Sequence, residues 1–190
     1  MKLRDIAFIA IGTALMCVLA PLSIPIGIVP ISLATFALYL IGTLLGPFKA
    51  SISVLLYIII GVIGAPVFSK FQAGPSVIMG PTGGFIIGYV PAVFVQALLT
   101  TRFKDRKSAY VFGILLGTVI VYATGMAWFL VVTAGKYTFA QAMAACVYPF
   151  LIGDTVKLII SVMVGYKLRP IIERVTDTSR YRSSRKVKNR

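Results

Sequence analysis

Six long apolar stretches, separated by short segments rich in polar residues, glycine or proline, account for most of the 190 residues. They lie at residues 6–22, 31–45, 48–63, 84–99, 109–134 and 148–168. A helix needs ~20 apolar residues to cross the hydrocarbon core of a bilayer, and most of these stretches approach that length. Two are 16 residues long, short for a span, so we expect their helices to extend into the loops or the bilayer to thin locally.

The pattern predicts an all-α integral membrane protein with six transmembrane helices in one bundle. The transmembrane domain would cover residues 1–175, and residues 176–190 would form a basic cytoplasmic tail. Composition agrees, since 58% of the residues are hydrophobic, above the ~45–50% of ordinary soluble domains. The first stretch resembles the apolar part of a signal peptide, but no cleavage site followed by a polar domain is present, so we interpret it as a span.

Basic residues fall on one set of alternating loops. They precede the first stretch, begin the third, separate the fourth from the fifth, and follow the sixth: Lys2, Arg4, Lys49, Arg102, Lys104, Arg106, Lys107, Lys167, Arg169, Arg174 and the tail to Arg190. The other loops carry only Lys70 and Lys136. Because cytoplasmic loops of membrane proteins are enriched in Lys and Arg, both termini are predicted in the cytoplasm of a multi-pass cell-membrane protein. The net charge of +14 therefore indicates contact with membrane lipid rather than with nucleic acid.

The inventory of reactive side chains is small. The chain has no histidine and only five acidic residues, so common general bases and metal ligands are scarce. Cys17 and Cys146 lie within apolar stretches and are expected to be free thiols. We therefore predict no catalytic residues, no metal site and no cofactor, and favour recognition of a small solute for transport over an enzymatic reaction.

One charged pair, Asp154 and Lys157, lies inside a predicted span. The two residues are three apart and share a helix face. If the helix begins at Tyr148, Asp154 lies ~9 Å along it, in the outer half of the membrane. Charges there are costly and normally face a bundle interior or a wet cavity. The pair is either a structural ion pair or, the interpretation we favour, a site for a ligand with donors and acceptors, such as a ureido group. Gly153–Asp154 does not indicate an intramembrane aspartyl protease, because a second intramembrane acid is missing.

A glycine-rich run, Gly80-Pro81-Thr82-Gly83-Gly84, opens the fourth stretch. It lacks the Lys-Ser/Thr ending of a nucleotide-binding P-loop. It is either a turn in which Thr82 caps a helix, or a helix start whose exposed N–H groups and glycines admit a ligand close to the backbone. The outer loops would be residues 23–30, 64–83 and 135–147, and the last of these favours a short interfacial helix before Pro149.

Two further patterns allow more than one interpretation. Ala7, Ala10 and Ala14, with Gly12 nearby, give the first stretch a small-residue face, which suits either packing inside the bundle or contact with a partner helix. Aromatic residues gather in the outer half as interface anchors, core residues or walls for a flat ligand: Phe68, Phe71, Phe85, Tyr137, Tyr148 and Phe150.

Three segments, taken in order, resemble the BioY family, the biotin-specific substrate-binding (S) components of energy-coupling-factor (ECF) transporters. They are GAPVF at 64–68, GPTGGF at 80–85 and PFLIGDTVK at 149–157, the last being the most specific. The likeness covers nearly the whole chain. Ile152 and Phe85 stand where many members have proline and tyrosine, and the second difference removes a hydroxyl near the expected pocket.

The resemblance implies a function for the domain at residues 1–175. Such proteins capture biotin outside and deliver it inward with a module of two ATPases and a transmembrane scaffold protein, so ATP hydrolysis would belong to the partners. Asp154 and Lys157 would hold the polar groups of biotin, Ala7, Ala10 and Ala14 would contact the scaffold, and the rest of the substrate site would come from Thr82, Gly83, Gly84, Phe85 and Tyr148. An S component for another vitamin, or a membrane assembly protein with a purely structural ion pair, remains the alternative.

Overall fold

The structure is a computed structural model that describes residues 3–25, 28–103 and 106–188, with side chains described as far as residue 172. Its long helices follow the apolar stretches, because a backbone in hydrocarbon must satisfy its N–H and C=O groups internally. The principal helices are α1 (Leu3–Leu19), α2 (Ala34–Leu44), α3 (Pro47–Ile63), α5 (Gly83–Arg102), α6 (Lys107–Val132) and α8 (Tyr148–Lys188).

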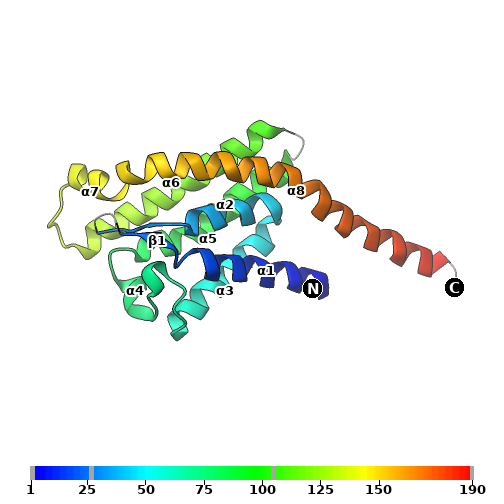
Figure 1. Cartoon of the computed structure of the whole chain (residues 1–190), viewed down its shortest axis with the longest axis horizontal. Helices are drawn as coiled ribbons and strands as arrows, with labels where there is room; N and C mark the ends of the chain where they lie inside the picture. Colours follow the sequence, from blue (N-terminus) through cyan, green and yellow to red (C-terminus); the bar gives the residue numbers. More distant parts are fainter. Residues whose placement is uncertain (1–2, 26–27, 104–105, 189–190) are drawn as a thin grey trace.

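These helices form one bundle with two distinct ends (Figure 1). Helix α5 packs along α6, α2 lies between α5 and α8, and α3 joins α1 to α5. The hairpin containing β1, the short helix α4 and the helix α7 gather at one end, whereas both chain termini lie toward the other (Figure 1). The two ends of the bundle therefore differ, since the short elements lie at one and the chain termini at the other.

Within the described residues, three helical segments are long and apolar enough to cross a membrane. They are Gly83–Arg102, Lys107–Val132 and the combined segment Phe139–Ile172, while Ala34–Leu44 and Pro47–Ile63 are shorter apolar helices. Helix α2 has 11 residues and is therefore only about 17 Å long. The prediction of a mostly helical membrane protein is confirmed at this coarser level.

The second predicted span was wrong at its start. Residues 31 and 32 form strand β2 (Ile31–Ser32), which pairs in antiparallel fashion with β1 (Ser23–Ile24). The Ser32 hydroxyl donates to the Ala20 carbonyl at 2.7 Å and accepts from the Ala34 N–H at 2.9 Å. This side chain therefore joins the end of α1 to the start of α2, and helical structure begins only at Ala34.

The loop after α3, predicted to be an outer loop, is ordered by a buried aromatic residue. It contains the 3₁₀ turn η1 (Ser69–Phe71) and helix α4 (Pro75–Met79). Phe68 is fully buried and meets Tyr57 edge to face, with 5.6 Å between ring centroids. Phe68 is thus a core residue, which anchors the loop on α3.

Two further expectations concern the outer end of α8. The short helix expected before Pro149 is confirmed as α7 (Phe139–Cys146), whose start carries a reciprocal capping box between Thr138 and Gln141. Helix α8 continues past residue 168 to Lys188, so no break in the helix marks the predicted boundary between residues 175 and 176.

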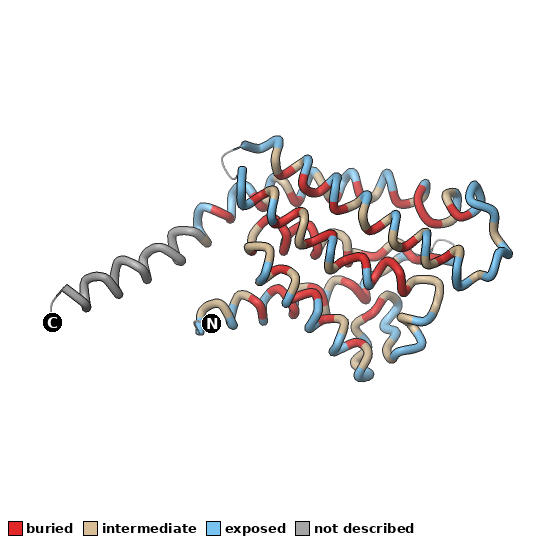
Figure 2. Tube along the Cα trace, turned by 180° about the vertical axis from the view of Figure 1, so that it is seen from behind, coloured by how far each residue is buried: buried red, intermediate tan, exposed pale blue. Residues whose placement is uncertain are grey.

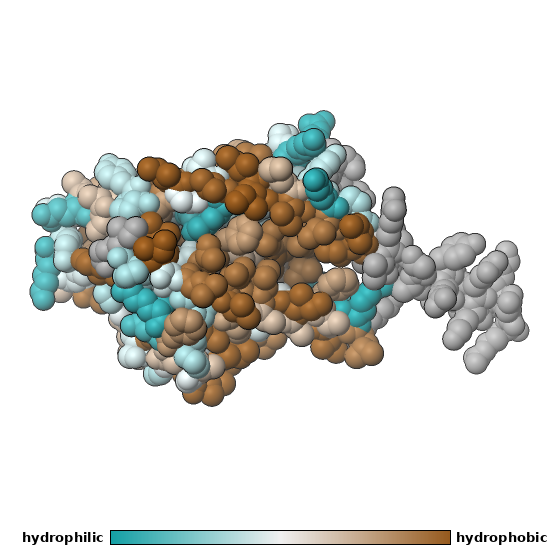
Figure 3. Space-filling view, in the orientation of Figure 1, coloured by the Kyte–Doolittle hydropathy of each residue, from teal (hydrophilic) through white to brown (hydrophobic). Residues whose placement is uncertain are grey.

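Large apolar side chains cover the outside of the bundle as well as its core. Buried positions face the helix contacts, while exposed positions line the outer sides (Figure 2). Side chains as large as Ile11, Phe48 and Phe112 are more than half exposed. Apolar side chains cover the middle of the visible face, and hydrophilic ones gather mainly toward its ends (Figure 3). A surface of this kind suits a lipid environment rather than water.

Candidate functional site

Asp154 lies in the second turn of α8 and is 95% buried, since only 5% of its surface is exposed. Its Oδ1 accepts from the Thr35 hydroxyl of α2 and from the Lys157 ammonium, both at 2.9 Å. Its Oδ2 accepts from the Tyr122 hydroxyl of α6 at 2.6 Å. Three helices therefore hold one carboxylate in a fixed orientation by charge-assisted hydrogen bonds.

The two oxygens of Asp154 differ in their remaining capacity. A carboxylate offers about four acceptor positions, two on each oxygen. Oδ1 uses both positions on Thr35 and Lys157, whereas Oδ2 uses one on Tyr122. Asp154 also lines an internal cavity. The site thus presents one acceptor position of a buried anion to a space that a solute can enter.

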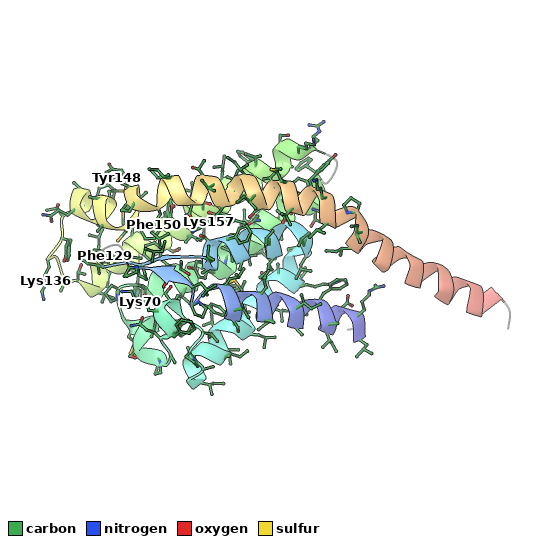
Figure 4. All side chains as sticks on the ribbon, viewed as in Figure 1. Lys70, Phe129, Lys136, Tyr148, Phe150 and Lys157 are labelled. Atoms are coloured by element: carbon green, nitrogen blue, oxygen red, sulfur yellow. The ribbon has the colours of Figure 1, made fainter. Side chains whose placement is uncertain are left out.

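Lys157 lies between α8 and α2, one turn further along α8 (Figure 4). Its ammonium donates to the Ser32 carbonyl at 2.7 Å, to the Thr35 hydroxyl at 2.9 Å and to Asp154 at 2.9 Å. An ammonium has three donors, so all of them are used within the protein. Lys157 accordingly holds Asp154 and Ser32, in strand β2, in position. It does not line the cavity.

The cavity has a volume of about 40 Å³, room for roughly three water molecules. Helices α2, α3, α5, α6 and α8 contribute to its walls, and the hairpin and the loop after α3 cover it. Its polar lining residues are Ser32, Thr35, Tyr57, Ser69, Thr82, Tyr89, Tyr122 and Asp154. Its apolar lining residues are Val29, Pro30, Val77, Phe85, Ile86, Val121 and Phe150.

The glycine-rich run contributes two of its predicted residues to this cavity. Thr82 and Phe85 line it, and Thr82 precedes α5 without capping it through its side chain. Gly83 and Gly84 face other parts of the protein. A Cβ on Gly83 would lie 1.7 Å from the Ile78 carbonyl oxygen, and one on Gly84 would lie 2.2 Å from the Trp128 Cβ. Glycine is needed here because α4 and α6 approach the start of α5 so closely.

Comparison with known proteins identifies the family of the chain. The model of the BioY family matches residues 1–174 of the chain. The chain belongs to the BioY family. One similar relative is the "Probable biotin transporter BioY" of Pyrococcus horikoshii, which is 34% identical over 89% of this chain and 98% of that protein. Another is the "Biotin transporter BioY2" of Lactococcus lactis, which is 32% identical over 95% of this chain and 96% of that protein. The "Biotin transporter BioY" of Rhodobacter capsulatus is 36% identical over 85% of this chain and 91% of that protein.

A solved structure shares the fold. The crystal structure of "the S-component for biotin from an ECF-type ABC transporter" matches with a TM-score of 0.81 and 26% sequence identity, over 89% of this chain and 92% of that one. The predicted family is thereby confirmed. A BioY chain with several apolar helices is a membrane protein, as expected from its hydropathy.

The remaining predicted residues of this BioY chain lie outside the cavity. Tyr148 begins α8, is 59% exposed, and points away from the bundle (Figure 4). Its neighbour Phe150 is buried and lines the cavity. Ala7, Ala10 and Ala14 are exposed on α1, whereas Gly12 is buried against Ser53 of α3. The alanine face is therefore free of contacts inside the bundle.

Six polar residues of the candidate site were not predicted from the sequence: Ser32, Thr35, Tyr57, Ser69, Tyr89 and Tyr122. Tyr57 and Tyr89 are more than 90% buried, and their hydroxyls have no hydrogen-bond partner among the described residues. Buried hydroxyls normally find a partner, so these two are available to a ligand. The one signal in the sequence was the presence of tyrosine within otherwise aliphatic spans.

Proposed function

We propose that this chain is the biotin-binding S component of an ECF-type transporter, which captures biotin outside the cell and delivers it inward. The observation that carries the proposal is the free acceptor position on Asp154 Oδ2, which faces a cavity whose remaining lining is largely aromatic, aliphatic and hydroxyl-bearing. Support comes also from relatives named as biotin transporters and from the likeness to an S component for biotin.

The lining suits the head group of biotin. A ureido N–H donates to Asp154 Oδ2, and the hydroxyls of Tyr57 and Tyr89 donate to the ureido carbonyl. Phe85 and Phe150 cover the fused rings, and Thr82 closes the outer side. Lys157 acts through Asp154 rather than by direct contact, because its three donors are used. Gly83 and Gly84 act by allowing the packing that places Thr82 and Phe85.

The cavity of about 40 Å³ must enlarge before it holds a bicyclic vitamin with its acyl tail. The hairpin β1–β2 and the loop after α3 cover the cavity, and both are short segments at the outer end of the bundle. We propose that these covers move apart to admit biotin and close over it. Tyr148 lies at the same end, and we propose that it meets biotin only while these covers are apart.

We propose six spans, formed by α1, α2, α3, α5, α6 and α8, with both termini in the cytoplasm. The positions of the basic residues support this orientation, and so does the placement of both termini at one end of the bundle (Figure 1). Residues 176–190 then form a basic cytoplasmic extension. The outer end, with the cavity and its covers, faces the source of the vitamin.

Delivery requires partners, and we propose an ECF module of two ATPases and a transmembrane scaffold protein. The exposed Ala7, Ala10 and Ala14 support a scaffold contact on α1, since small residues let helices approach closely in a membrane. Ala10→Trp should abolish co-purification with the module while leaving biotin binding intact. Leu55→Trp, on the exposed face of α3, is the matched control and should co-purify as the wild type does.

The direct test of the proposed function is binding by the purified protein in lipid nanodiscs. Calorimetry with biotin should show saturable one-to-one binding, and thiamine should show none. Mass spectrometry of the protein from cells grown with biotin should detect the vitamin. If another vitamin co-purifies and biotin does not bind, the chain is an S component of different specificity. If no small molecule binds or raises the melting temperature, the assembly interpretation of the Asp154–Lys157 pair is correct instead.

A further inference from the structure

The inner end of the cavity cannot receive the carboxylate of an acidic ligand. Asp154 is the charged residue that lines it, and an anion held next to that carboxylate would be repelled. Lys157 offers the anion no hydrogen bond, because it does not line the cavity and its three donors are used by Ser32, Thr35 and Asp154. A ligand with a neutral ureido head and an acidic tail must therefore place its tail toward the outer end.

A second recess, of about 220 Å³, adjoins the cavity at its outer end. The two spaces share Pro30, Val77 and Thr82 in their walls, so only these side chains separate them. Lys70, Gln72 and Ser76 also line the recess and make it polar. Lys70 supplies its positive charge. Lys136, the other basic residue of the outer loops, does not line either space.

The segment that carries Lys70 is held firmly. Its backbone has φ +60° and ψ +31°, a left-handed conformation that residues other than glycine rarely adopt. The Lys70 N–H lies 3.0 Å from the Ser23 hydroxyl and 3.2 Å from the Pro21 carbonyl, which ties the loop to the hairpin. On its N-terminal side, buried Phe68 anchors the same turn in the core. An unusual backbone conformation, retained by its surroundings, commonly marks a ligand-binding segment.

We infer that Lys70 binds the carboxylate of the solute's acyl tail, so that the site selects a ligand with a neutral hydrogen-bonding head and an anionic tail. The inference rests on the proposed function, and it adds a specificity-determining residue outside the cavity. Figure 4 places Lys70 beside the hairpin, at the end of the molecule opposite the C-terminal part of α8, which is the end proposed above for solute entry. Because Lys70 is exposed, the attraction is partly screened by salt.

The test compares biotin with biotinamide, whose tail carries a neutral amide in place of the carboxylate. Calorimetry on the full-length protein in zwitterionic nanodiscs should show that the wild type prefers biotin by about two- to fivefold at low salt, as expected for an exposed ion pair. The preference should shrink at ~1 M NaCl. Lys70→Met should remove the preference for biotin, because it should lower the affinity for biotin and leave the affinity for biotinamide unchanged. Lys70→Arg should retain it.

Lys136→Met is the matched control, because it removes an equally exposed cation from the same end of the molecule. It should leave the preference intact. Equal affinities of the wild type for the acid and the amide would overturn the inference, and so would an undiminished preference in Lys70→Met. Both results leave the proposed function standing. Failure of the wild type to bind either compound overturns the proposed function, and the inference with it.

Discussion

Asp154 and Arg169 are both buried charges on the side of α8 that packs against α2, yet their surroundings differ. Asp154 is held by side chains from three helices and keeps one acceptor position toward a cavity. Arg169 donates to the Thr100 carbonyl at 2.6 Å and the Thr43 carbonyl at 3.3 Å, and its guanidinium lies 5.6 Å from the Tyr110 ring.

The carbonyls that Arg169 contacts belong to the last turns of α2 and α5, where backbone oxygens lack partners within the helix. A cation there is also favoured by the negative ends of the two helices. Arg169 thus ties three helices together at the end of the bundle opposite the cavity. A buried charge in a membrane bundle indicates a binding site only when it keeps capacity for a ligand and faces a space.

The largest effect is expected for Asp154→Asn. The amide loses the negative charge that strengthens a hydrogen bond from a ureido N–H, and it leaves Lys157 without its carboxylate. Because a hydrogen bond to a charged group contributes up to about 3 kcal/mol, biotin affinity should fall roughly a hundredfold in calorimetry. Thr155→Val is the matched control, since Thr155 is exposed on the same turn of α8. Wild-type affinity in Asp154→Asn would show that the pair is structural.

Arg169→Leu should lower stability and leave biotin affinity unchanged. Loss of the hydrogen bonds to Thr43 and Thr100 should lower the stability of the bundle by about 2–3 kcal/mol, measured as a lower melting temperature. The protein that remains folded should bind biotin with the affinity of the wild type. Arg169→Lys should recover part of the stability, because an ammonium retains a donor but not the planar geometry. If Arg169→Leu lowered biotin affinity as much as Asp154→Asn does, Arg169 would not be a purely structural charge, and the contrast with Asp154 would be wrong.

The same contrast explains how much the sequence could predict. Continuous apolar runs are a strong signal, so the helices were placed within a few residues. The two-residue strands of the hairpin are too short to leave a pattern, and they depend on contacts distant in sequence. Ser32, for example, accepts from Lys157, 125 residues away. The start of α2 was therefore predicted three residues too early.

For the site, a charged residue within an apolar span was informative, whereas the sequence did not show which residues of different helices come together. Asp154 stood out because an acid within a span is rare and costly. Thr35 and Tyr122 come from two other helices, and a single sequence does not indicate which helix faces meet. Gly84 suggested close approach of a ligand, whereas the space beside it is filled by Trp128. Glycine indicates that something lies close to the backbone, without indicating what it is.

A smaller effect on biotin affinity is expected for Tyr122→Phe, which removes a hydrogen bond to Asp154. Its hydroxyl donates to Oδ2, the oxygen that we assign to the ligand, and so fixes the direction of the remaining lone pair. Removing the hydroxyl should lower the affinity for biotin about tenfold, which is equivalent to one hydrogen bond of ~1.4 kcal/mol. The melting temperature should change little. An unchanged affinity would mean that Oδ2 does not contact the vitamin.

The smallest effect is expected for Tyr148→Ala. The sequence placed Tyr148 in the site, but its side chain is 59% exposed at the start of α8 and does not line the cavity. If it meets the solute only while the covers are open, the equilibrium affinity should change less than about twofold, because the closed complex does not include it. The association rate from stopped-flow measurements should fall by more than the affinity does. A loss of affinity comparable to that of Tyr122→Phe would instead place Tyr148 in the closed site, and the ligand would then extend from Asp154 to the first residue of α8.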